Sequence, residues 1–103
     1  MDIETVKNYL KIDTDDEKET DLIQSFIDSS RSYLSGAIDN FDIKMQNKNF
    51  ENMANLVMLA MISEWYDNRV YVKNDRYDKV SNIVRSMINQ LQYGTYEVAI
   101  SEN

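Results

Sequence analysis

The sequence contains no cysteine, no histidine and no proline, and it has two glycines among 103 residues. The absence of cysteine excludes disulfides, thiolate catalysis and cysteine-ligated zinc. The absence of histidine removes the commonest general base and the commonest ligand of transition metals. Proline and glycine are the residues that most often break helices, so their scarcity favours long, uninterrupted helices.

Positive charge is also scarce, because 18 acidic residues outnumber 11 basic ones and the net charge is −7. This balance argues against tight, non-specific binding of the whole surface to nucleic-acid phosphates. Residues 1–11 are charged and amphipathic and do not resemble a signal peptide. The length suits one domain. We expect the protein to be cytosolic in the cell that makes it.

Residues 50–68 form the most apolar stretch, in which residues 56–62 run without a polar side chain. Its Leu, Met and Ala residues favour helix, and a helix that is apolar nearly all round is buried on most of its faces. A membrane span needs about 20 apolar residues, which this stretch lacks. We therefore predict a buried central helix around which the rest of the chain packs.

Three further helices complete a predicted small, all-α, four-helix domain over residues 1–94. The first is capped by Asp2, and the second begins with a capping box that runs from Thr14 to Glu17 and ends at Gly36. The last covers residues 77–92. The apolar stripe of the first helix consists of Ile3, Val6, Tyr9 and Leu10.

Two segments fall outside this helical pattern. Residues 39–49 are polar and predict a surface loop or, alternatively, a segment that orders against a partner. Residues 95–103 predict an extended tail, in which Tyr96, Val98 and Ile100 share one side. The tail either frays or pairs with another chain, and we expect it to be dispensable for folding and needed for assembly.

The sequence offers no catalytic, cofactor-binding or metal motif. Asp13, Asp15 and Glu17 alternate as in a calcium-binding loop, but Lys18 stands at the position that requires glycine. There is no glycine-rich phosphate loop, and no two of the acids are singled out as an acid–base pair. We therefore predict a protein that is not an enzyme and that uses no cofactor.

The end of the central helix carries the candidate structural and assembly residues. Trp65 and Tyr66 suit packing in the core and at an interface. Asn68 can adopt a left-handed conformation and end the helix. Arg69 suits either the negative end of the helix dipole or a salt bridge across a subunit contact. Glu64 is expected at the rim of the core.

Four parts of this pattern together resemble a known family. They are the opening at residues 3–13, the acidic helix start at residues 15–16, the apolar helix at residues 22–27, and the Trp-Tyr-Asp-Asn-Arg ending at residues 65–69. The chain is similar to the head-tail connector proteins, also called adaptor or head-completion proteins, of long-tailed double-stranded DNA bacteriophages.

The resemblance implies a structural virion protein at the head-tail interface. Its subunits would form a ring under the portal protein, extend the DNA channel and join the capsid to a tail-side connector or stopper protein. Phage DNA would pass through without sequence-specific binding, and no membrane would be involved. The subunit would be made in the cytoplasm of the bacterial host. The alternative is a small acidic helical module that sequesters a protein partner.

Overall fold

The computed structural model describes residues 1–13, 16–68 and 81–94. These residues contain helices and no strand, so the predicted all-α class is confirmed. The helices are α1 (Ile3–Leu10), α2 (Glu17–Ala37), α3 (Phe41–Lys44), α4 (Lys48–Asp67) and α6 (Asn82–Tyr93). The division of the chain at residue 94 stays a prediction, because residues 95–103 lie outside the described part.

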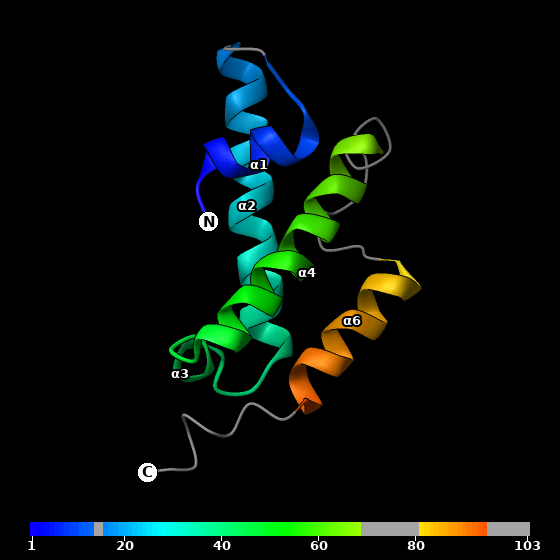
Figure 1. Ribbon diagram of the computed structural model, residues 1–103. Coiled ribbons are helices and arrows are strands. Elements are labelled where there is room, and N and C mark those ends of the chain that lie inside the picture. The colour runs from blue at the N-terminus through cyan, green and yellow to red at the C-terminus, as the bar shows by residue number, and fades with distance from the viewer. Residues whose placement is uncertain (14–15, 69–80, 95–103) are drawn as a thin grey trace.

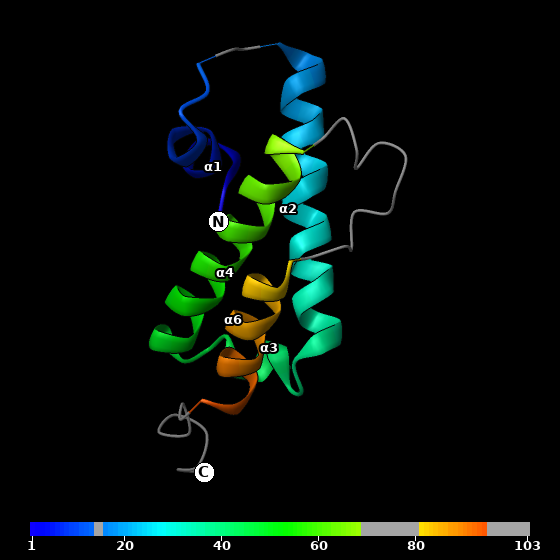
Figure 2. The same cartoon turned by 90° about the vertical axis from the view of Figure 1, so that its right-hand side faces the viewer.

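Helix α4 is the centre of the bundle, as its apolar sequence predicts. It packs most extensively against α2, and it also contacts α6 and α1. Helices α2, α4 and α6 contact one another pairwise, α1 crosses the upper part of the bundle, and α3 closes its lower end (Figures 1 and 2). The apolar core of α4 consists of Phe50, Ala54, Val57, Met58, Leu59, Met61, Ile62 and Trp65.

Helices α1 and α2 both begin at aspartates. The Asp2 carboxylate accepts a hydrogen bond from the Thr5 amide at 2.9 Å, which confirms the predicted cap. This hydrogen bond lowers the pKa of Asp2 below its ordinary value. Helix α2 begins later than predicted, because its N-cap is Asp16, whose carboxylate accepts from the Lys18 amide at 2.9 Å. Thr14 lies outside the described residues.

Two sequence predictions for α1 and α2 are wrong. Tyr9 is 52% exposed, because Val6 and its neighbours on the buried side of α1 face α2 and α4 and leave Tyr9 at the edge. Gly36 does not end α2, which continues to Ala37 and is followed by extended Ile38. Ile38 follows Ala37 and is 2% exposed. The chain therefore continues beyond Gly36 in a way that buries this apolar side chain.

The polar connection at residues 39–49 is not a plain surface loop. It contains α3, and Phe41 is 3% exposed. The Phe41 and Phe50 rings pack edge to face with their centroids 6.1 Å apart. The guanidinium carbon of Arg31 lies over the Phe41 ring, 5.3 Å from its centroid. A single aromatic residue in a polar segment therefore anchors it to the core, which no sequence periodicity signals.

Helix α6 is shorter than predicted, since it begins at Asn82 rather than at residue 77. Ser81 is its N-cap, with the hydroxyl accepting from the Val84 amide at 3.2 Å. Residues 69–80 lie outside the described part. The buried side chains of α6 are Val84, Ile88 and Leu91.

Candidate assembly site

Trp65 lies in the core near the end of α4, as its sequence position predicts. It is 3% exposed, and its ring packs against Phe26 of α2 with the centroids 5.8 Å apart and the planes inclined by 50°. Tilted aromatic pairs of this kind add to the stabilisation from burial. Trp65 is therefore a packing residue that joins α4 to α2.

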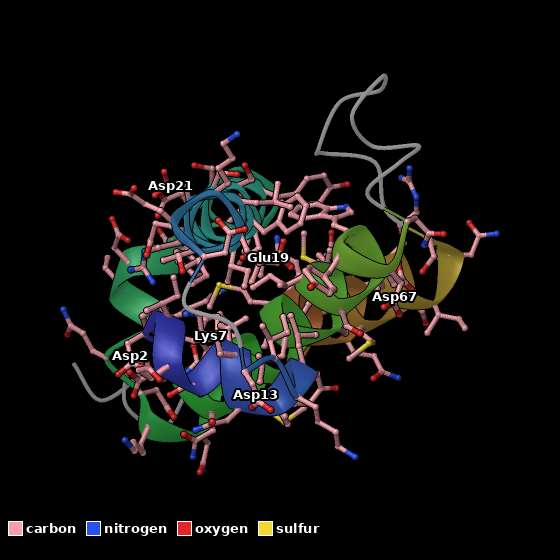
Figure 3. The ribbon with its side chains drawn as sticks, turned by 90° about the horizontal axis from the view of Figure 1, so that it is seen from above. Asp2, Lys7, Asp13, Glu19, Asp21 and Asp67 are labelled. Carbon is pink, nitrogen blue, oxygen red and sulfur yellow. The ribbon has the colours of Figure 1, made fainter. Side chains whose placement is uncertain are left out.

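Tyr66 makes the adjoining polar contact between the same two helices. Its hydroxyl donates a hydrogen bond to the Glu19 carboxylate near the start of α2. Viewed from that end of the bundle, Glu19 lies on the inner side of α2 and Asp21 on its outer side (Figure 3). The Trp65–Tyr66 pair thus holds the end of α4 against α2 through one apolar and one polar contact.

Asn68 ends α4, but not in the way predicted. Its φ of −110° and ψ of 24° are not left-handed. Its backbone amide donates to the Glu64 carbonyl at 3.0 Å, and its side-chain amide donates to the same carbonyl at 2.9 Å. The side-chain amide is thus a second donor to the Glu64 carbonyl, and the helix ends without a left-handed backbone conformation. Arg69 lies outside the described residues.

Glu64 connects α4 to α6 at the rim of the core. Its carboxylate accepts a hydrogen bond from the Ser81 hydroxyl at 2.8 Å, and the Ser81 oxygen in turn accepts from the Val84 amide. One serine therefore caps α6 and anchors its start to α4. Because α4 and α6 are antiparallel (Figure 1), this contact sets where α6 begins along α4.

The opposite end of α6 is held by Gln92. Its amide oxygen accepts from the Asp39 backbone amide at 3.0 Å and from the Lys44 ammonium at 3.5 Å. Its amide nitrogen donates to the Asp39 carboxylate at 3.2 Å. Both ends of α6 are therefore tied to the other helices, and the bundle presents its outer surfaces in a fixed arrangement.

Several large apolar side chains lie on the outer surface of this framework. Met53 is 43% exposed and Leu56 is 52% exposed on α4, and Ala60 lies one turn further along the same side. Ile83 is 72% exposed on α6, with half-buried Met87 one turn away. These five residues are here called the outer apolar face.

The two helices that carry the outer apolar face contact each other. Arg85 and Asn89 line a hollow shared with α2, so that edge of α6 faces α2. By helical spacing, Ile83 and Met87 lie on the other edge of α6, with the buried side chains of Val84, Ile88 and Leu91 between the two edges. Exposed apolar patches of this kind mark interaction surfaces more often than scattered single residues do.

The described residues offer no evident site for a metal ion or a membrane. No group of three or more acidic side chains among residues 1–13, 16–68 and 81–94 is placed to hold a metal. No helix within these ranges is long and apolar enough to cross a bilayer. What the arrangement can do is hold helices rigidly and present surfaces to other proteins.

Sequence reasoning identified Trp65, Tyr66 and Asn68 but missed the polar side chains that meet them. Ser81 was detectable, because a serine just before an apolar repeat is a helix-start signal. Glu19 and Gln92 have no such signal, since their partners are distant in sequence. The tail residues Tyr96, Val98 and Ile100 lie outside the described part, so their pairing stays a prediction.

Comparison with known proteins agrees with this picture of a small helical subunit. The comparison with curated proteins and the comparison with solved structures gave no significant match. The family model described as "Phage gp6-like head-tail connector protein" matches residues 1–93. Because this match covers all the helices described above, the chain is a member of the gp6-like family of phage head-tail connector proteins.

Proposed function

We propose that this connector subunit assembles into a ring beneath the portal of the filled capsid. The ring extends the DNA channel and joins the capsid to a tail-side connector or stopper protein. The observation that carries the proposal is the family match over residues 1–93. The family is structural, so the chain acts through binding in the virion after synthesis in the host cytoplasm.

The outer apolar face supports the ring. A ring needs a heterologous contact, in which one surface of a subunit meets a different surface of the next copy. Leu56 and Ile83 are exposed in the isolated subunit, and burial in such a contact removes their side chains from water. The face belongs to two helices that are tied together at Glu64 and Ser81, so its shape is preorganised.

Trp65, Tyr66 and Asn68 serve this assembly indirectly, as residues that fix the end of α4. Their contacts with Phe26, Glu19 and the Glu64 carbonyl keep α4 in register with α2. We assign Arg69, directly after this end, to the same region as the cation for a helix end or a subunit contact. None of these residues has a catalytic role in the proposal.

Negative charge suits a protein through which DNA passes. The net charge is −7, and Asp13, Asp21 and Asp67 lie around the end of the bundle seen in Figure 3. Carboxylates near a channel repel phosphates and prevent DNA from binding during passage. The proposal therefore includes DNA as a passing molecule without sequence-specific contacts.

The test is co-purification of the full-length chain with the portal protein of the same genome, followed by electron microscopy of the complex. A stable complex with a ring on the portal is the expected result. The matched variants are Leu56→Glu in the outer apolar face and Ser32→Glu, at an exposed polar position of α2, which contributes no residue to that face.

Leu56→Glu should prevent ring formation, while Ser32→Glu should preserve it. Both positions are exposed, so both variants should retain the thermal stability of the parent chain to within about 0.5 kcal/mol. If the parent chain does not bind the portal, the proposed function is wrong. If Leu56→Glu forms normal rings, the outer apolar face is not the ring contact.

A further inference from the structure

A hollow of about 190 Å³ lies between α2 and α6, on the side of α6 that faces away from the outer apolar face. Tyr33 and Ala37 line it from α2, and Arg85, Ile88 and Asn89 line it from α6. Ile88 is 5% exposed and forms an apolar floor, whereas Arg85 and Asn89 are exposed at the rim. The hollow is smaller than the roughly 300–1,000 Å³ pockets that bind small molecules, so it suits a few side chains of another protein segment.

The charge of this hollow differs from that of the molecule as a whole. Within residues 1–13, 16–68 and 81–94, Arg85 forms no ion pair, in a chain whose net charge is −7. A guanidinium offers donors in a planar fork that fits a carboxylate. Asn89 lies one turn further along α6 and adds a side-chain amide. The hollow therefore suits a carboxylate that is flanked by apolar side chains.

Residues 95–103 of this chain have that composition. Glu97 provides the carboxylate, and it stands between Tyr96 and Val98, with Ala99 and Ile100 following. These nine residues span about 30 Å when extended, at roughly 3.3 Å per residue. Neighbouring helices pack about 10 Å apart, so the segment is long enough to cross from one subunit to the next.

The end of α6 favours a neighbouring copy over the same copy as the receptor. Gly94 follows α6 with φ of −74° and ψ of 169°, which is extended backbone. A left-handed residue at this position would turn the chain back along the helix, as in the common glycine caps. The extended backbone of Gly94 does not make this turn.

We infer that residues 95–103 of one subunit dock in the α2–α6 hollow of the next subunit, with Glu97 paired to Arg85. This inference rests on the proposed ring. The contact is heterologous, because the tail of one subunit meets a different surface, the α2–α6 hollow, of the next. The apolar side chains of the docked tail cover Ile88 and Tyr33 of the subunit that has the hollow, beside the ion pair. The tail thus acts as a strap between consecutive subunits.

The first test exploits the lack of cysteine in the parent chain. Full-length Asn89→Cys and full-length Ala99→Cys are mixed, assembled on the portal protein and oxidised. A disulfide-linked dimer of the two variants is expected. The control pairs Ala99→Cys with Asn8→Cys, an exposed position on α1 away from the hollow, and should give no link.

The chain that carries both Asn89→Cys and Ala99→Cys distinguishes the two possible receptors. Linked oligomers on the portal are expected if the tail crosses to the next copy. A monomer closed by an internal disulfide shows that the tail binds its own subunit, and this overturns the inference. Absence of any link above the Asn8→Cys control also overturns it.

The second test is a charge exchange in full-length chains. Arg85→Glu and Glu97→Arg should each weaken ring assembly on the portal about tenfold, and the double variant should recover most of that loss. Lys18→Glu makes the same charge change at an exposed position of α2 and should have little effect. Unweakened assembly of both single variants refutes the pairing, while rings formed by the parent chain would still support the proposed function.

Discussion

Replacement of Trp65 by alanine tests the packing at the centre of the bundle most directly. The indole is 3% exposed and is the single tryptophan of the chain. It fills the space between α4 and α2, where its ring lies 5.8 Å from that of Phe26. Trp65→Ala removes this side chain and leaves a cavity that the surrounding helices fill only in part.

The expected loss is large relative to the stability of a domain of this size. Truncation of a buried tryptophan costs about 3–5 kcal/mol through lost burial and the cavity. The tilted pairing with Phe26 contributes about 0.5–1.5 kcal/mol of this. The free energy of unfolding of a small domain is about 5–15 kcal/mol, so Trp65→Ala is expected to remove a large fraction of it.

The assay is urea denaturation followed by far-UV circular dichroism, since the variant lacks the tryptophan needed for fluorescence. Tyr93→Ala is the matched aromatic control, because Tyr93 is 80% exposed and its loss should change the free energy of unfolding by less than about 0.5 kcal/mol. A double-mutant cycle with Phe26→Ala isolates the contribution of the ring pair.

A loss below about 1 kcal/mol for Trp65→Ala would refute this account. It would mean that Trp65 lies on a surface that a partner covers, rather than in the core of the subunit. A normal loss with no coupling to Phe26 would leave the burial intact but remove the ring pair as a source of stability.

Three further predictions concern the helix ends. Asp16→Ala should lower the free energy of unfolding by about 1 kcal/mol, while Thr14→Ala should leave the urea midpoint unchanged; the reverse pattern would contradict a start of α2 after Asp16. Ser81→Ala should cost about 1–2 kcal/mol, because it removes the cap of α6 and the donor to Glu64, and a loss near zero would refute that link. The folded pKa of Asp2 is lowered, so its stabilisation is present above the unfolded pKa and is lost as the pH falls through the folded pKa. The melting temperature of the parent chain should therefore fall toward that of Asp2→Asn on acidification, and a constant difference between the two would contradict this.

The sequence alone determined the class of the fold and its centre. The apolar run at residues 50–68 predicted a buried central helix, and the structure has this helix at Lys48–Asp67. Asp2 and Trp65 were also assigned correctly, because a cap and a large apolar side chain on the most apolar helix depend on nearby residues. The family resemblance was recognisable for a related reason. It rests on short motifs of neighbouring residues, such as the Trp-Tyr-Asp-Asn-Arg ending at residues 65–69.

The tertiary structure decided the features that depend on distant residues. Phe41 looked like an isolated aromatic in a loop, and its contact with Phe50 makes it part of the core. The apolar run at residues 50–68 predicted a central helix buried on most of its faces, yet Leu56 of α4 is exposed. Ile83 of α6 is exposed as well, because no other described helix covers that side of the two helices. The hollow beside Arg85 exists only where α2 meets α6. Helix formation follows from neighbours in the sequence, whereas a surface for another subunit follows from which faces the packed helices leave uncovered.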